Sequence, residues 1–187
     1  MPGRAAVPMR SAPRRAARTV VASVAVLWTL GAFGDTYTKP VDTRSYQLGI
    51  IGGFAEVVRL GVKTLALSEV LPPDAMDDLL PDAEIVAARN DVQLYRESEL
   101  LVTDLYPADV AAGLDVLLIY TGDTLEQYLT LKARREDLVR NNRYSGAARR
   151  ALARDFGRLL SYPDPVIDDL IARNGQQASN SKDTTQD

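Results

Sequence analysis

The sequence VLLIY at residues 116–120, followed at once by TGDT at 121–124, carries the clearest signal for the fold. Five apolar residues in a row, bounded by a glycine turn, predict a strand buried on both faces. The helical composition of residues 124–139 predicts a helix directly after that turn. A buried strand that feeds a helix is typical of α/β proteins.

Outward from this centre, apolar periodicity and breaker residues divide the chain into further elements. We expect strands at residues 63–68, 92–96 and 100–105. We expect helices at residues 46–59, 73–90 with a break or kink at Pro81, 107–112, 144–160 and 164–172. Because strands and helices alternate, these elements predict a small, mostly parallel sheet of about four strands with flanking helices and a helical C-terminal segment.

The first 34 residues have a different composition from the rest. Five arginines precede an apolar run of 16 residues from Thr19 to Gly34, and residues 1–34 contain no acidic residue. This length suits a signal-peptide core better than a membrane span, which needs about 20 residues. Small residues at Ala32 and Gly34 predict cleavage before Asp35, and hence an exported (periplasmic or secreted) or leader-anchored protein.

Two other interpretations of this leader stay open. An arginine-rich segment without acidic residues also suits an organellar transit peptide, and a wrongly assigned start would leave a cytoplasmic protein. The rest of the chain is interpreted as a linker at 35–44, a single α/β domain at 45–174 and a disordered polar tail at 175–187.

Composition restricts the chemistry. The chain has no cysteine and no histidine, which excludes disulfides, thiolate nucleophiles, zinc sites of Cys and His, and Ser-His-Asp catalysis. Its net charge is −3, and residues 35–187 alone carry −8, because five of the 22 basic residues lie in the leader. So acidic a domain argues against nucleic-acid binding through its overall field. The sequence names no cofactor and no reaction class.

The turn Thr121-Gly122-Asp123-Thr124 is the first candidate binding site. Ligands of α/β proteins collect where strands end and helices begin, so its amides and hydroxyls suit a phosphate or carboxylate, and Asp123 suits a hydroxyl, ammonium or magnesium ion. The alternative is structural. Asp123 followed by Glu126 has the spacing of a capping box, which stabilises a helix without any ligand.

Acid–base chemistry without histidine is the second hypothesis. If the expected strands are neighbours, Asp104, Tyr106 and Tyr120 reach the same edge of the sheet as Thr121. A carboxylate beside a phenol transfers protons once burial brings its pKa toward neutrality. Asp104, Tyr120 and Asp123 are therefore the candidate catalytic residues. A turn aspartate with half-buried tyrosines is the alternative.

The distribution of charge is the third feature. Residues 64–126 hold 14 acidic residues and two arginines, whereas residues 132–158 hold nine basic residues and three acidic ones. Arg143 and Arg149 are candidate partners for an anion, since a guanidinium binds carboxylate or phosphate in a bidentate manner. Alternatively, the basic helices form ordinary ion pairs with the acidic half.

An acidic run at Asp74, Asp77, Asp78, Asp82 and Glu84 lacks the spacing of a calcium loop, and it suits a solvated helix N-terminus. No metal site is assigned. Together these features predict a protein that binds a small anionic or hydroxylated molecule, with catalysis left open. The alternative is a non-catalytic interaction protein that docks an acidic protein partner through its arginine-rich C-terminal helices.

Overall fold

The computed structural model describes residues 42–107 and 109–183, with side chains through residue 175. These residues belong to one compact unit and form five helices and three strands. The expected leader and its cleavage position before Asp35 lie outside the described residues. Among the described helices, none has both the length and the apolar character required to cross a bilayer.

The sheet has the strand order β1-β3-β2, with β3 (Val116–Tyr120) in the middle. Both β1 (Leu65–Leu67) and β2 (Gln93–Glu97) run antiparallel to it. Tyr120 lies opposite Leu65 and Gln93 at one end of the sheet, and Val116 lies opposite Glu97 at the other end. This register defines the two ends of the sheet.

The expected mostly parallel sheet of about four strands is therefore wrong. Residues 100–105 form no strand, and residues 109–113 form turns where part of the helix at 107–112 was expected. The described residues between β2 and β3, 98–107 and 109–115, are irregular, and the chain leaves β2 and enters β3 at the same end of the sheet. Without a crossover helix between β2 and β3, the chain reverses direction, so β3 is antiparallel to β2. Because α2 returns the chain so that β2 runs in the same direction as β1, β3 is antiparallel to β1 as well.

The strand prediction for residues 116–120 is confirmed, and all five residues are buried. Val116, Leu118 and Tyr120 pack into one hydrophobic cluster, while Leu117 and Ile119 pack into another. The uninterrupted apolar run results from layers on both faces of a central strand. Such a run does not indicate whether the strand is parallel or antiparallel to its neighbours.

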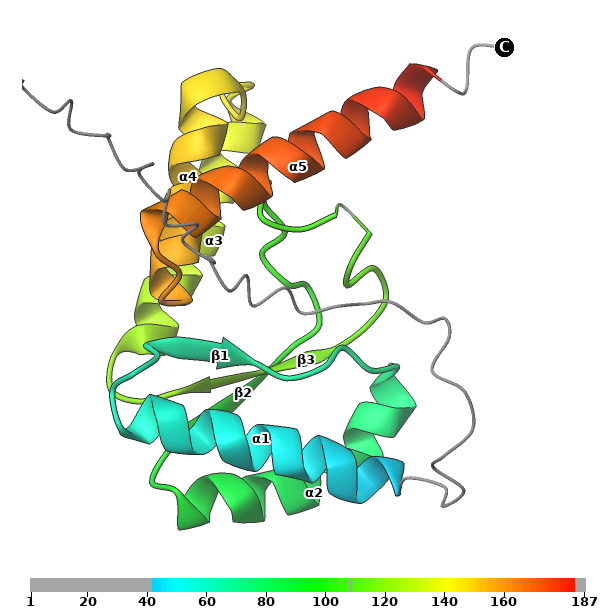
Figure 1. Ribbon diagram of the computed structural model, residues 1–187, viewed down its shortest axis with the longest axis vertical. Coiled ribbons are helices and arrows are strands. Elements are labelled where there is room, and N and C mark those ends of the chain that lie inside the picture. Colours follow the sequence, from blue (N-terminus) through cyan, green and yellow to red (C-terminus); the bar gives the residue numbers. More distant parts are fainter. Residues whose placement is uncertain (1–41, 108, 184–187) are drawn as a thin grey trace, which may run out of the picture. The chain divides into compact units, whose positions relative to one another are not determined.

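One face is covered by α1 (Thr43–Arg59) and α2 (Pro73–Arg89), which lie side by side below the sheet in Figure 1. Asp42 caps α1 by accepting a hydrogen bond from the Arg44 amide. The helix α2 is continuous through Pro81 and bends along its length (Figure 1), consistent with the expected kink. This layer is filled mainly by aliphatic and small residues: Ile51, Ala55, Met76, Leu79 and Ala83.

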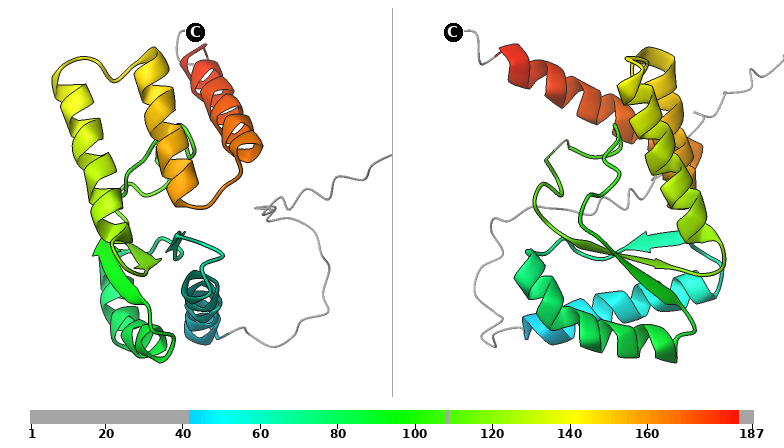
Figure 2. Two further views of the ribbon diagram at one scale, coloured as in Figure 1. Left: turned by 90° about the vertical axis from the view of Figure 1, so that its left-hand side faces the viewer. Right: turned by 180° about the vertical axis from the view of Figure 1, so that it is seen from behind.

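The other face is covered by residues 98–115 and by α3 (Thr124–Arg140), α4 (Gly146–Leu159) and α5 (Asp164–Asp183), which lie side by side in Figure 2. Its core is aromatic, because the rings of Tyr106 and Tyr128 lie 6.5 and 6.0 Å from that of Phe156. The helix α5 extends past its expected end at Ala172 and into the segment expected to be a tail.

Candidate functional site

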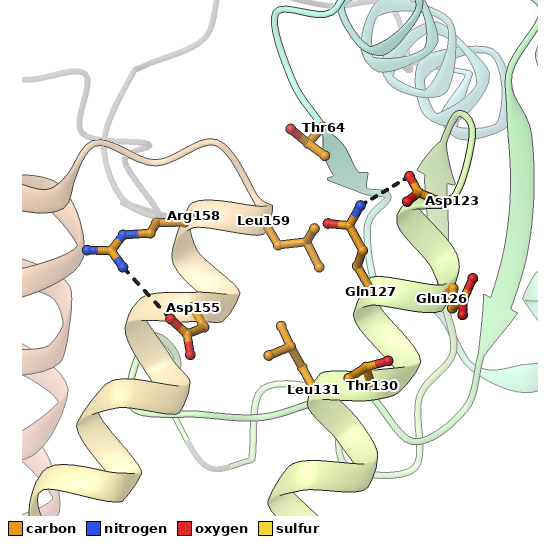
Figure 3. A pocket seen from close by; sticks show the side chains of 9 residues that line it. All are labelled: Thr64, Asp123, Glu126, Gln127, Thr130, Leu131, Asp155, Arg158 and Leu159. Carbon is orange, nitrogen blue, oxygen red and sulfur yellow. Dashed lines mark hydrogen bonds and ion pairs between the residues drawn. The ribbon is translucent and has the colours of Figure 1, made fainter.

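A groove of about 640 Å³ lies between α3 and α4, and we call it the α3–α4 groove (Figure 3). Its lining combines two leucines with polar and charged side chains from both helices and from the start of β1: Thr64, Asp123, Glu126, Gln127, Thr130, Leu131, Asp155, Arg158 and Leu159.

The α3 side of the groove begins at the turn that the sequence singles out. Gly122 has φ +61°, a left-handed conformation that glycine adopts without strain, so the chain turns sharply from β3 into α3. The Thr124 hydroxyl donates to the carbonyl of Thr121 at 2.8 Å. This bond uses Thr124, which is buried, to close the turn, so its hydroxyl does not face a ligand.

Asp123 contributes an exposed carboxylate to the groove. It makes no side-chain capping bond to the start of α3, so the capping box allowed by the sequence does not form. Instead, its Oδ1 accepts a hydrogen bond from Nε2 of Gln127 at 3.1 Å (Figure 3). This hydrogen bond fixes the side-chain amide of Gln127, which lies one helical turn after Asp123 on α3.

The α4 side supplies Asp155, Arg158 and Leu159. Asp155 accepts a hydrogen bond from Arg134 at 2.7 Å, and its other oxygen lies 3.8 Å from Arg158. Arg158 also binds Asp164 through two hydrogen bonds, of 3.0 and 3.1 Å. Its guanidinium is therefore occupied by carboxylates of the chain itself.

Thr64 reaches the groove because the start of β1 is tied to the end of α4. The Thr64 amide donates to Oγ of Ser161 at 2.8 Å, and Nζ of Lys63 donates to the carbonyl of Leu160 at 2.7 Å. Burial lowers the pKa of Lys63, whose ammonium also lies 5.0 Å from the ring centre of Tyr162. These contacts fix the end of the groove.

In Figure 3, Leu131 and Leu159 face each other across the middle of the groove. Leu159 is almost fully buried, and both leucines pack with the aromatic core. Gln127 points toward the same space, with Asp123 and Thr64 at one end. The groove therefore has an apolar floor and a rim of hydrogen-bonding groups, and no histidine, cysteine or cluster of metal ligands occurs among the described residues.

Asp104 and Tyr106 lie elsewhere. Asp104 accepts a hydrogen bond from Nε of Arg149 at 2.7 Å, and its carbonyl accepts one from Asn174 at 3.1 Å. Asp104 and Arg149, predicted separately as a catalytic candidate and an anion partner, thus bind each other. The hydroxyl of Tyr106 lies 3.4 Å from that of Tyr162, and burial raises its pKa.

The structure does not bring Asp104 to the turn after β3. Tyr120 ends β3, whereas residues 98–115, which include Asp104, are attached to the end that holds Val116, about 13 Å away at 3.3 Å per residue. Along α4, Arg149 and Arg158 are also about 13 Å apart at the helical rise. Because residues 100–105 form no strand beside β3, the sheet edge expected to hold Asp104, Tyr106 and Tyr120 beside Thr121 is not formed.

Tyr120 and Arg143 also have ordinary surroundings. Tyr120 is buried, and burial together with nearby Tyr95 raises its pKa, which disfavours its phenolate. Arg143 donates to Asp137 at 3.2 Å on the exposed end of α3. Neither residue lines the α3–α4 groove. Of the predicted site residues, Asp123 is the one that lines it.

The acidic run on α2 is dispersed rather than clustered. Asp82 binds Arg44 at 2.8 Å, and Asp77 binds Arg96. Within residues 42–107 and 109–183, no three acidic side chains converge as metal ligands would. The run thus supplies partners for arginines on neighbouring elements.

A buried ionic network is the feature that sequence reasoning missed. Glu97, only 4% exposed, accepts hydrogen bonds from Lys132 at 3.0 Å on each carboxylate oxygen and from the Tyr128 hydroxyl at 2.9 Å. The Tyr128 hydroxyl in turn accepts from the Leu101 amide at 3.0 Å, and burial raises its pKa. The only sign of this network in the sequence is that Tyr128 and Lys132 lie four residues apart, on one face of α3. That spacing does not identify Glu97 as their partner.

Comparisons of the chain with protein-family models, with curated proteins and with solved structures gave no significant match.

Proposed function

We propose that this protein binds a small hydroxylated molecule in the α3–α4 groove. The observation that carries the proposal is the combination of an apolar floor, formed by Leu131 and Leu159, with a hydrogen-bonding rim in a cavity of about 640 Å³. Small-molecule sites typically measure about 300 to 1,000 Å³ and place a few polar groups around an apolar surface. A ring or chain that carries hydroxyls on one side matches this distribution.

The charges of the groove favour hydroxyls over anions. Asp123, Glu126 and Asp155 supply three carboxylates, and the guanidinium of Arg158 is already bound to Asp164. Carboxylates accept hydrogen bonds from hydroxyls and repel other anions. An anionic ligand at this groove therefore has less support than a hydroxylated one.

The alternative, docking of an acidic protein through the basic helices, also has less support. Arg149, Arg154 and Arg158 each bind a carboxylate of this chain, from Asp104, Asp168 and Asp164 respectively. An acidic partner would have to replace these contacts, each of which is worth about 0 to 1 kcal/mol at an exposed site.

The experiment is a titration of the full chain, followed by ¹H–¹⁵N NMR, with ribose, glucose, inositol and glycerol as probes. We expect at least one probe to shift the amide signals of residues 123–131 and 155–159 and to raise the melting temperature by mass action. If none of the four probes shifts these signals, the proposal is overturned.

Variants locate the binding. Gln127→Phe fills the middle of the groove and should abolish the response, while Asp123→Asn should weaken it by removing an ionic acceptor. Asp78→Asn is the matched control, because it removes an exposed carboxylate from α2, outside the groove. Equal binding by Gln127→Phe and the native chain would show that the ligand lies elsewhere.

A further inference from the structure

A second cavity, of about 260 Å³, lies farther along α3 from the turn after β3 and has no role in the proposed function. It is formed by residues 98–102, by residues 111–113 and by Lys132, Arg135 and Glu136 of α3. We call it the loop cavity. Two cations lie in its wall, against a surface of small and aliphatic side chains.

Arg135 lacks an acceptor that its surroundings demand. Its Nε is shielded from solvent and meets no hydrogen-bond acceptor among the described residues. Its guanidinium lies 5.4 Å from the ring centre of Tyr144, a cation–π contact that holds the group in place and leaves its donors unused. This shielded donor leaves a place for an acceptor from solvent or from a ligand, because buried polar groups in folded proteins are nearly always paired with protein or with ordered water.

Lys132 provides a further hydrogen-bond donor in the same wall, although its charge is balanced by Glu97. Both of its contacts to Glu97 measure 3.0 Å, so the ammonium is anchored, and its side chain is still 21% exposed. An ammonium has three donors, and Glu97 takes two of them. The third is available to a ligand.

The rest of the cavity is apolar or negatively charged. Leu100, Val102 and Ala111 supply aliphatic surface, whereas Glu99 and Glu136 are exposed carboxylates at its edge. Two hydrated carboxylates disfavour a phosphate dianion more strongly than a single negative charge. The size and surface of the cavity suit a compact ligand with one acidic group and an apolar body.

We propose that the loop cavity binds a small monocarboxylate, whose carboxylate is held by Arg135 and Lys132 and whose apolar part contacts residues 100–102 and 111. A guanidinium and a carboxylate form short, charge-assisted hydrogen bonds with matched planar geometry. This site is separate from the α3–α4 groove, and either one can exist without the other.

The test is an NMR titration of the full chain with butyrate and benzoate, compared with butanol and benzyl alcohol as uncharged analogues. We expect the carboxylates to shift the amide signals of residues 98–102 and 111–113 and the Nε–H signal of Arg135. The alcohols should bind about tenfold more weakly or worse, because they lack the ionic contact. Absence of these shifts with both carboxylates overturns the proposal, whatever happens at residues 123–131.

Two variants separate ligand binding from folding. Arg135→Met should weaken carboxylate binding about tenfold or more, whereas Arg134→Met, which changes an arginine bound to Asp155 outside the cavity, should leave it unchanged. If Arg135→Met does not fold, Ala112→Leu keeps both cations and fills the exposed mouth of the cavity, and it should abolish binding. Unchanged binding by Ala112→Leu, or by a folded Arg135→Met, contradicts the proposal.

Discussion

The two faces of the sheet are packed in different ways. Against α1 and α2, the core consists of aliphatic and small residues, and the cavity lined by Ile50, Ile51 and Leu79 measures only about 10 Å³. That volume is at the lower limit of the space that holds one water molecule. Against α3 and α4, the core contains Tyr128 and Phe156, a buried glutamate and the walls of both larger cavities.

This difference assigns different roles to the two layers: the α1–α2 layer supports the sheet, and the layer of α3 and α4 offers space for ligands. The α1–α2 layer offers a ligand little space, so its main role is to hold β3 in position. The other layer is formed by α3, α4 and the irregular segment between β2 and β3, and both larger cavities lie between these elements. Because a five-residue strand serves both layers, substitutions on the two faces should have different costs, and these differences can be measured.

The largest effects are expected from core truncations on the two faces. Phe156→Ala should lower the free energy of unfolding by about 4 kcal/mol, since Phe156 is fully buried between two other rings. Met76→Ala, its counterpart in the α1–α2 layer, should cost about 3 kcal/mol because a smaller and more adaptable side chain is lost. Urea unfolding measures both values. A larger loss for Met76→Ala would contradict the expectation that the larger aromatic side chain contributes more to stability.

Removal of the ammonium from the buried network tests the polar side of the comparison. Lys132→Met should cost about 3 kcal/mol, because it leaves the carboxylate of Glu97 buried without its cation. Adding Glu97→Gln should recover much of this loss, since the buried charge is then gone as well. If the double variant is as unstable as the two single losses added together, Glu97 and Lys132 act independently, contrary to their contacts.

Two helical glycines give a smaller and opposite pair of effects. A Cβ on Gly157 of α4 would lie 2.7 Å from Cγ1 of buried Ile167, so Gly157→Ala should cost about 1 to 2 kcal/mol. A Cβ on Gly53 of α1 would meet nothing within 4 Å, so Gly53→Ala should stabilise the protein by about 0.5 to 1 kcal/mol. Thermal unfolding of the two variants measures the signs. Stabilisation by Gly157→Ala would show that α4 and α5 can separate at low cost.

Local patterns predicted the elements well where periodicity and breakers agree. The strand at 116–120 and the helix that starts at Thr124 were both predicted from the sequence, because a continuous apolar run and a glycine turn are local features. The direction of β3 was not predicted, because it depends on how residues 98–115 travel, and that irregular path is set by contacts with α3 and α4. Apolar residues at 100–105 pack as a buried loop, for which the sequence offers no periodic signal.

Of the residues that line the α3–α4 groove, the sequence predicted one as a site residue, Asp123. Asp123 was found because a strand-to-helix turn is visible in sequence, whereas Gln127, Asp155 and Arg158 enter the groove through the packing of α4 on α3. The error over Asp104 follows from the error over the sheet, because residues 100–105 form no strand that could bring Asp104 to the edge of β3. Arg149 then had a partner within the chain, which charge counting along the sequence could not identify.

The smallest expected effect concerns the contact that joins the two layers. Arg96 of β2 donates to Asp115, which precedes β3, at 2.6 Å, and it also binds Asp77 and the carbonyl of Pro73 on α2. Burial alone would raise the pKa of Asp115, but hydrogen bonds from Ser98 and Arg96 outweigh it and hold the pKa below its usual range.

A carboxylate with a lowered pKa stabilises the folded state above its unfolded pKa of about 4, and this contribution is lost as the pH falls through the folded value. We therefore expect the difference in unfolding free energy between the native chain and Asp115→Asn to be largest near neutral pH and to shrink below about pH 4. Urea unfolding between neutral pH and about pH 3 measures it. A difference that does not change over this interval would mean that Asp115 contributes through its shape and not through its charge, and that Arg96 couples the layers through α2 alone.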